Sequence, residues 1–193
     1  MTRREGRGHT GQVGARRKRG GRLWLALIGA AFAVTACGVI PTPPVALPDV
    51  TLDLPASAAA QGRVVYLRQD AFAGVSLPSA LQRLSLTGTA AYRANGGTLR
   101  QAGVYVRSNL DTLPGTCTSL VVVVVCEAAG EAAQAVGTLP LNPDASTSFT
   151  LSGPALDAAA RAGRGYFGVR AVEGDSLAGE QVSLTDLQAR ARF

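Results

Sequence analysis

Apolar and polar residues alternate along much of the chain, and this alternation is typical of half-buried β-strands. In the longest stretch, Leu84, Leu86, Ala90 and Tyr92 lie two or four positions apart, and the polar residues Ser85, Thr87, Thr89 and Arg93 occupy alternate positions, which is the period of a strand. Shorter stretches of the same kind, bounded by turn residues, predict seven or eight strands in total. Seven of them are assigned to residues 50–54, 84–94, 99–108, 120–125, 147–151, 166–172 and 182–193.

Two neighbouring strands are predicted to form a hairpin. Asn95-Gly96-Gly97 lies between residues 84–94 and 99–108, and glycine after asparagine is typical of a hairpin turn. A three-residue loop places Leu86 opposite Val106 and keeps the apolar residues of both strands on one face. A two-residue loop would mix the faces, so we favour the longer turn.

Three further features complete the predicted fold. The run 120–125 is apolar at every position, which predicts a central strand covered on both faces. Gly153-Pro154 and Gly163 flank an alanine-rich segment, which predicts a short helix near 154–162. The apolar positions of the last strand change phase at Thr185-Asp186, which predicts a β-bulge. These elements indicate an all-β fold, an antiparallel β-sandwich of the immunoglobulin-like or a related type.

The N-terminal region has the features of an export signal. Residues 23–34 are apolar, follow eight Arg or Lys residues and end in small residues, the three parts of a signal peptide. The motif Val34-Thr35-Ala36-Cys37 resembles the lipobox of bacterial lipoproteins. This resemblance implies cleavage between Ala36 and Cys37, a diacylglyceryl group on the Cys37 thiol and an acyl group on its new amino terminus.

An uncleaved transmembrane helix is the alternative interpretation. Residues 23–40 are eighteen uncharged residues, which is the lower limit for a membrane span. Pro41, Pro43 and Pro44 follow at once, and they favour the lipoprotein interpretation. In both cases the cationic block stays in the cytoplasm and the domain is exported.

The predicted organisation has three parts. Residues 1–36 are the cleaved signal peptide, residues 37–62 are the lipidated cysteine with a proline-rich tether, and residues 63–193 are the β-sandwich. Proline-rich segments are extended and rise about 3.1 Å per residue. The tether therefore separates the domain from its membrane anchor.

The positive charge of the chain belongs to its signal. Residues 1–36 have a net charge of +7, whereas residues 37–193 have eleven Arg against twelve Asp or Glu, a net charge of −1. Affinity for nucleic acid requires clustered cations, and the cations after residue 36 are scattered along the sequence. We expect the membrane, reached through the lipid, to be a partner, and we expect no nucleic-acid binding.

Composition also removes most catalytic options. The only histidine, His9, and the only lysine, Lys18, precede residue 36. Nucleophilic triads, Ser-Lys dyads, Schiff bases and histidine-ligated metals all need one of these residue types. We therefore expect a protein that is not an enzyme and that has no cofactor, metal or catalytic residues.

Cys117 and Cys126 are the only cysteines after Cys37. In an exported chain such a pair predicts a disulfide. Nine residues fully extended span about 30 Å, whereas bridged Cα atoms lie within about 6.8 Å. The chain must therefore fold back between the two cysteines, and two unpaired, buried thiols are the alternative.

Other patterns resemble functional motifs but lack what the chemistry needs. Gly174-Asp175-Ser176-Leu177 spells the block of the GDSL esterases and lipases, whose serine needs a base that the exported part does not contain. Glu173, Asp175 and Glu180 match no calcium loop and predict a solvated acidic turn. Four tyrosines are predicted to pack in the core or at its rim rather than to stack on sugars: Tyr66, Tyr92, Tyr105 and Tyr166.

The expected function is that of a lipid-anchored protein of the bacterial cell envelope, with a non-enzymatic β-sandwich for binding or structural contact. The sequence does not identify the envelope protein or ligand that it contacts. The alternative is an extracytoplasmic module that captures a sugar or a small apolar ligand, which a concave pocket lined by tyrosines would favour and a flat, arginine-dotted sheet would disfavour. A hydrolase acting through carboxylates alone would need two of them roughly 5–10 Å apart in one cleft.

Overall fold

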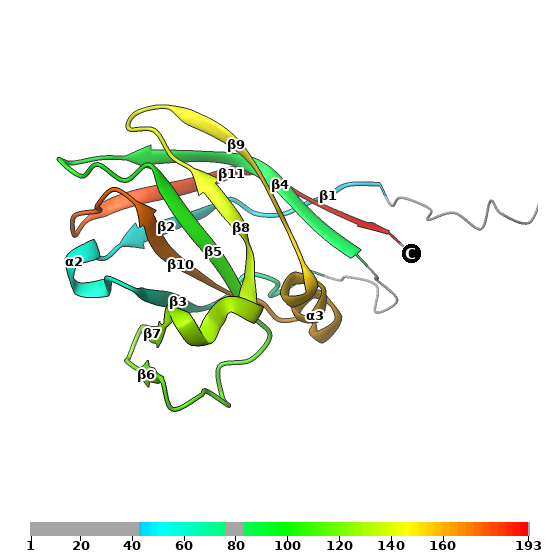
Figure 1. Ribbon diagram of the computed structural model, residues 1–193. Coiled ribbons are helices and arrows are strands. Elements are labelled where there is room, and N and C mark those ends of the chain that lie inside the picture. Colours follow the sequence, from blue (N-terminus) through cyan, green and yellow to red (C-terminus); the bar gives the residue numbers. More distant parts are fainter. Residues whose placement is uncertain (1–42, 76–82, 193) are drawn as a thin grey trace, which may run out of the picture. The chain divides into compact units, whose positions relative to one another are not determined.

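Two antiparallel sheets stack face to face in the computed structural model, which describes residues 43–75 and 83–192 (Figure 1). Sheet A has the strand order β1-β11-β4-β9, and β2 also pairs with β11. Sheet B has the order β6-β7-β3-β10-β5-β8. The predicted all-β antiparallel sandwich is therefore confirmed.

Sheet A has five strands and sheet B has six. Sheet A consists of β1 (Val45–Ala46), β2 (Val50–Leu54), β4 (Arg83–Arg93), β9 (Ser146–Ser152) and β11 (Glu180–Arg192). Sheet B consists of β3 (Arg63–Asp70), β5 (Gln101–Arg107), β6 (Cys117–Ser119), β7 (Val123–Glu127), β8 (Ala135–Pro140) and β10 (Tyr166–Glu173). The helical segments in the described ranges are α2 (Ser57–Ala60), the 3₁₀ helix η1 (Ala128–Gln134) and α3 (Pro154–Ala162).

The main core lies between the sheets, because successive side chains of a strand point to opposite faces. Sheet A contributes the alternate apolar residues Leu84, Leu86, Tyr92, Phe149, Leu151, Val182 and Leu184. Sheet B contributes Ala102, Val104, Val106, Val136 and Leu139. A second, smaller core of Val64, Tyr66, Tyr105, Val124 and Cys126 covers the outer face of sheet B.

The predicted hairpin between residues 84–94 and 99–108 is wrong. β4 pairs with β11 and β9, whereas β5 pairs with β10 and β8, so Leu86 and Val106 belong to different sheets. The connection between the strands crosses from one sheet to the other. Alternation alone does not distinguish two strands paired in one sheet from two strands that face each other across the core.

The predicted central strand at 120–125 is also wrong. Leu120, Val121 and Val122 form the turn of the β6–β7 hairpin and are 49%, 93% and 71% exposed. β7 starts only at Val123 and lies next to the edge strand β6. The apolar run therefore divides into an exposed turn and a strand.

The predictions for the helix and the bulge are confirmed. α3 starts at Pro154 and ends before Gly163, whose φ of 63° is the left-handed conformation that glycine adopts without strain. The β4–β11 register shifts between Thr185 and Gln188, where Asp186 has a φ of 53°. The bulge keeps both halves of β11 directed toward the core.

The domain begins earlier than the sequence indicated. β1 and β2 pair with β11, so much of the segment predicted as a tether (37–62) belongs to the sandwich. Residues 39–193 form one compact unit, distinct from residues 1–38, and its core residues all lie between Leu52 and Ala191. All core residues of the described ranges therefore belong to this one unit.

The predicted lipidation and cleavage residues, Cys37 and Ala36, lie outside the described residues. Within the described ranges, no helix combines the length and the apolar character needed to cross a membrane.

Glu180 holds the connection between the two sheets. It is 1% exposed, and its Oε1 accepts the backbone N–H groups of Asn95 and Gly97 at 2.6 and 2.7 Å. Its Oε2 accepts the hydroxyl of Tyr92 and, at 2.8 Å, the N–H of Leu177. These N–H groups are satisfied by the carboxylate, so the turn closes without pairing β4 to β5.

The same contacts determine how Glu180 ionises. Burial by itself would raise the pKa of this carboxyl, but the hydrogen bonds from Tyr92 and from three backbone N–H groups outweigh burial and lower the pKa to about 2. Burial and the neighbouring carboxylate raise the pKa of Tyr92. Tyr92 therefore stays protonated and Glu180 stays ionised over the ordinary pH range.

We predict that Glu180→Gln removes part of the acid sensitivity of the fold. The ordinary glutamate pKa is about 4.3, so the ionised carboxylate stabilises the folded state fully above that pH and loses this contribution as pH falls toward 2. The substitution should lower the free energy of unfolding at pH 7 by about 1–3 kcal/mol. It should also flatten the decline of stability below pH 4.5, measured by denaturant unfolding. The control is Glu173→Gln, at an exposed position; an acid-induced decline as steep in Glu180→Gln as in the native chain would refute the assignment.

Candidate functional site

A disulfide closes the β6–β7 hairpin at the edge of sheet B. Cys117 and Cys126 are register partners, and their sulfur atoms are bonded with the Cα atoms 4.0 Å apart. The chain folds back between them at residues 120–122, where Leu120 N–H donates to the carbonyl oxygen of Val123. The predicted disulfide is confirmed, and it indicates an oxidising, extracytoplasmic environment.

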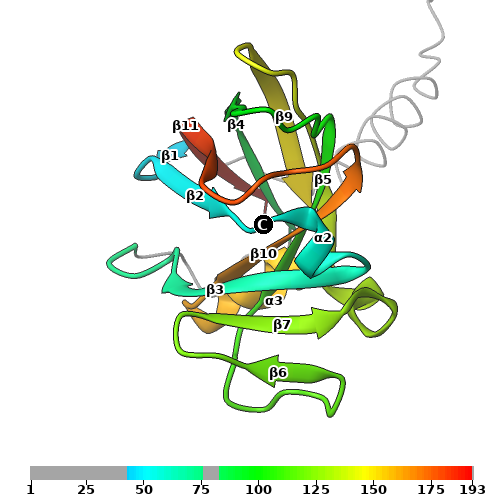
Figure 2. The same ribbon diagram turned by 90° about the vertical axis from the view of Figure 1, so that its left-hand side faces the viewer.

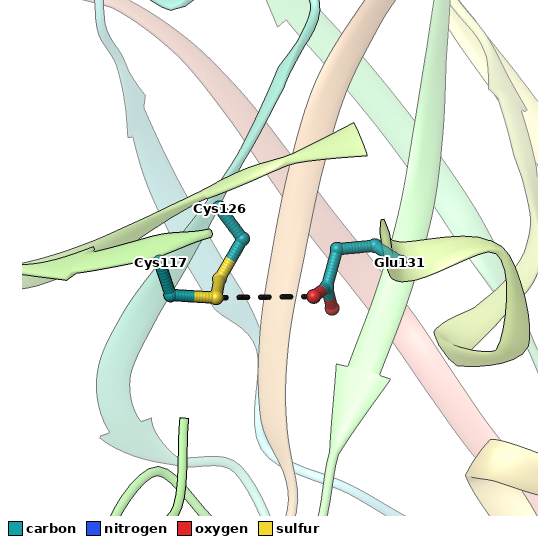
Figure 3. A group of neighbouring side chains, drawn as sticks. All are labelled: Cys117, Cys126 and Glu131. Carbon is teal, nitrogen blue, oxygen red and sulfur yellow. Dashed lines mark hydrogen bonds between the residues drawn. A yellow bond between two sulfur atoms is a disulfide. The ribbon is translucent and has the colours of Figure 1, made fainter. Parts of the chain in front are cut away.

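A buried carboxylate lies directly behind this disulfide. Glu131 of η1 is fully buried, and the Cys117 Sγ lies 3.9 Å from its Oε1 (Figure 3). Arg107 at the end of β5 donates to both oxygens of Glu131, from Nε at 2.9 Å and from Nη2 at 2.6 Å. The hydroxyl of Tyr66 on β3 donates to Oε2 at 2.6 Å. These bonds fasten η1 to the outer face of sheet B and support the hairpin.

The contacts within this cluster raise the pKa of two of its members, Arg107 and Tyr66. The hydrogen bond to Glu131 raises the pKa of Arg107. Burial, followed by the hydrogen bond to Glu131, raises the pKa of Tyr66 far above its usual value. The Arg107 guanidinium also lies 5.7 Å from the centre of the Tyr66 ring, within the range of a cation–π contact.

Among the described residues, the only group of three or more potential metal ligands consists of Cys117, Cys126 and Glu131. One ligand atom from each of Cys117, Cys126 and Glu131 lies within 4.8 Å of the others. Both sulfur atoms are bonded to each other, however, and both carboxylate oxygens accept hydrogen bonds from Arg107. In this oxidised form the cluster supports the hairpin and offers no free metal ligand.

An apolar groove opens between the hairpin side of sheet B and the edge strand β2 of sheet A. Its volume is about 580 Å³, within the roughly 300–1,000 Å³ of ligand-binding pockets. In Figure 2, β2 lies above β3, and β7 and β6 follow β3 on its other side; residues of all four strands line the groove. Six apolar side chains of sheet B line the groove and are buried or partly buried: Val65, Leu67, Val123, Val125, Phe167 and Val169.

The groove continues inward between the sheets. A narrower cavity of about 60 Å³ shares Leu52, Leu67, Phe167 and Val169 with it. Leu47 and Pro48, from the connection between β1 and β2, line that inner cavity. The two together form a continuous apolar lining that reaches the main core.

Polar groups are confined to the groove's border. Asp53, Arg63 and Thr118 contribute to its lining, and Asp53 accepts a hydrogen bond from Gln181 at 2.8 Å. Arg68 holds the hairpin turn by donating from Nε to the Leu120 carbonyl oxygen at 3.0 Å and from its guanidinium to Ser119. The exposed apolar turn at 120–122 therefore has a defined position beside the groove.

The other sequence candidates have structural roles. Ser176 is 6% exposed, and its hydroxyl donates to the Pro55 carbonyl oxygen at 2.8 Å. The predicted solvated acidic turn is wrong for Glu180, which is buried, although Glu173 and Asp175 are exposed. Three of the four tyrosines are buried, as predicted, and contribute no face for sugar stacking: Tyr66, Tyr92 and Tyr105.

Sequence reasoning missed the groove. Its walls come from β2, β3, β7 and β10, and β3 was not predicted, because Val64, Val65, Tyr66 and Leu67 are apolar at successive positions. The one signal in the sequence was the run 120–125, whose apolar residues exceed what a single buried face needs. These extra residues line the groove and form the hairpin turn.

Comparison with known proteins adds no assignment. The chain matches no protein-family model, no curated protein and no solved structure. Its function is therefore inferred from the groove, the disulfide and the N-terminal motif.

We predict that replacing both cysteines weakens the fold without abolishing it. A bridge between residues nine positions apart stabilises by about 3 kcal/mol through the entropy of the unfolded chain. The double variant Cys117→Ser/Cys126→Ser should lose that amount in urea unfolding, and reduction of the native chain should give a similar loss. Alkylation of either residue in the native, unreduced protein would contradict the bridge.

Proposed function

We propose that this chain is a non-enzymatic lipoprotein of the bacterial cell envelope, anchored through Cys37, whose sandwich captures a small apolar ligand. The observation that supports capture is the groove of about 580 Å³ between β2 and the inner face of β7, β3 and β10. The lipobox-like motif and the disulfide support export and anchoring. The proposal therefore combines the expected localisation, lipid anchoring in the cell envelope, with the alternative expected function, capture of a small apolar ligand.

The partial exposure of the groove's apolar wall favours a bound ligand over simple structural contact. Val123, Val125 and Phe167 face the groove and are only partly buried. Apolar surface left in water forgoes about 25 cal/mol for each Å² that burial would remove. Sheets that closed completely would gain this energy, so an open apolar wall is best explained by a molecule that covers it.

The lining favours an acyl or alkyl chain over a sugar. A sugar site needs several polar donors and acceptors together with an exposed aromatic face. Here Phe167 is the only aromatic residue of the lining, and the polar residues are Asp53, Arg63 and Thr118. An acyl chain requires length and apolar contact, which the groove and its inner extension supply.

The chemistry of the side chains supports binding without catalysis. No histidine or lysine follows residue 36. None of the four cavities found among the described residues is lined by two carboxylates, since Asp53 is the single acidic residue in their linings. The buried Glu131 and Glu180 each accept several hydrogen bonds. The arrangement therefore supports the binding module better than the carboxylate-only hydrolase.

The proposed anchor keeps the groove close to a supply of apolar ligand. Two or three acyl chains on one residue hold a protein to a bilayer effectively permanently. Tethering a binding site near its target raises the effective concentration of that target. A lipid-anchored domain with an apolar groove is thus suited to taking up ligands from, or delivering them to, the adjacent membrane.

We predict that Cys37→Ser abolishes incorporation of radiolabelled palmitate and causes unprocessed precursor to accumulate. The serine hydroxyl does not replace the thiol as acceptor of the diacylglyceryl group, and processing follows lipidation. Labelling and gel mobility of the protein expressed in a bacterium measure both effects, with Cys117→Ser/Cys126→Ser as the control that should remain labelled. Normal processing of Cys37→Ser would refute the lipoprotein assignment.

We predict that the domain binds a fluorescent fatty acid at one site per chain and that palmitate displaces it. Val125→Phe fills the groove with an apolar side chain and should weaken binding at least about tenfold, a loss of roughly 1.4 kcal/mol, with little change in stability.

The matched control for the groove is Val172→Phe, because Val172 is 45% exposed and does not line the groove. Fluorescence titration measures the affinity of each variant. Equal affinities in Val125→Phe and the native chain would show that the fatty acid binds elsewhere.

A further inference from the structure

Three arginines meet on the outer face of sheet A although they are far apart in the sequence. In the β4–β11 register Arg83 lies opposite Arg192, and Arg190 lies opposite Ser85. Ser85 in turn lies opposite Ser152 of β9. These five residues line a surface hollow of about 290 Å³ together with Leu84 and Ala191. Cations that are scattered along the sequence are therefore brought together at this place by strand pairing.

This arrangement of charge is unfavourable for the free protein. Like charges directly opposite each other on neighbouring strands destabilise a sheet. Among the described residues the single salt bridge joins Arg107 to Glu131, so no acidic side chain of the described ranges forms a salt bridge with these three arginines. The Asp157 carboxylate accepts the N–H of Leu84 through Oδ1 at 2.6 Å. An anion from outside the chain is the natural counter-charge.

The geometry favours an anion with several oxygen atoms. Guanidinium groups bind phosphate through two parallel hydrogen bonds, and the three arginines project from one face of adjacent strands. Ser152 adds an exposed hydroxyl at the same hollow. A phosphate group can thus contact two arginines and a hydroxyl at once.

The covalent chain leads from the predicted lipid to this surface. Val45 of β1 pairs with Ala189 of β11, the residue that precedes Arg190. Val45 lies eight positions after Cys37, and even a fully extended chain of this length spans at most about 29 Å. The starts of β1 and β4 and the end of β11 lie at the same end of the sandwich (Figure 1).

We propose that Arg83, Arg190 and Arg192, with Ser85 and Ser152, bind the phosphate of anionic phospholipid headgroups and dock this end of the sandwich on the membrane. Docking in the cell rests on the proposed lipid anchor, whereas headgroup binding does not. The site is separate from the apolar groove, with which it shares no lining residue. Binding would orient the domain in addition to tethering it.

The test uses the mature chain, residues 37–193, with Cys37→Ser so that no lipid contributes. The signal is omitted because its net charge of +7 would itself bind anionic vesicles. Cosedimentation at low ionic strength compares phosphatidylglycerol vesicles with phosphatidylcholine vesicles. The triple variant Arg83→Gln/Arg190→Gln/Arg192→Gln is compared with Arg93→Gln/Arg100→Gln/Arg164→Gln, which removes the same charge from exposed positions outside the hollow and outside the groove.

We expect binding to phosphatidylglycerol only, a loss on the order of 100-fold in the first triple variant and a much smaller loss in the second. Thermal unfolding must show that both variants are folded. Equal losses in the two variants, or no binding of the native sequence, would overturn the proposal. Binding of inorganic phosphate without binding to vesicles would overturn the headgroup assignment in favour of a soluble phosphate compound. Failure of Cys37 labelling would leave these results unchanged, because the assay contains no lipidated protein.

Discussion

The ion pair between Glu131 and Arg107 is the interaction on which the open side of the sandwich depends. Glu131 is fully buried and accepts hydrogen bonds from Arg107 and Tyr66. Removing one partner of a buried pair leaves an uncompensated charge, at a cost of about 3–5 kcal/mol. The pair therefore holds η1 on the outer face of sheet B, where η1 covers the second core.

The wall of the groove follows from that support. β7 and β6 extend sheet B beyond the strands that face sheet A, and their outer face is covered by the second core and the disulfide. The inner face of the same strands has no comparable cover, so Val123 and Val125 remain partly exposed. One side of the hairpin is thus rigidly packed, and the other is available to a ligand. Glu180 has the corresponding role at the connection between the sheets, and both carboxylates are used for architecture.

Local patterns predicted those parts of the fold that depend on local chemistry. Proline and glycine marked α3, the phase change marked the bulge at Asp186, and covalent geometry required the fold-back between Cys117 and Cys126. The predicted β4–β5 hairpin was wrong because its outcome depends on Glu180, which lies more than eighty residues away. The groove and the arginine hollow arise in the same way, from strand order and register, which alternation does not contain.

Taken together, the groove, the proposed anchor and the arginine hollow would suit a domain that works beside a membrane, as we propose. The groove offers apolar contact, the hollow would offer a counter-charge for headgroups, and β1, the first described strand after Cys37, pairs with β11 next to that hollow. The two sites are on different faces, so a docked domain would keep its groove free. A groove that stays free in a docked domain favours ligand capture over passive structural contact.

The most direct test of ligand capture is a methyl NMR titration of the mature chain with palmitate. The account predicts saturable shifts at the methyl groups of Leu52, Leu67, Val125 and Val169, which line the groove, with the exposed methyl groups of Val172 unchanged. Absence of saturable shifts, or shifts of equal size at Val172 and at the groove, would contradict it.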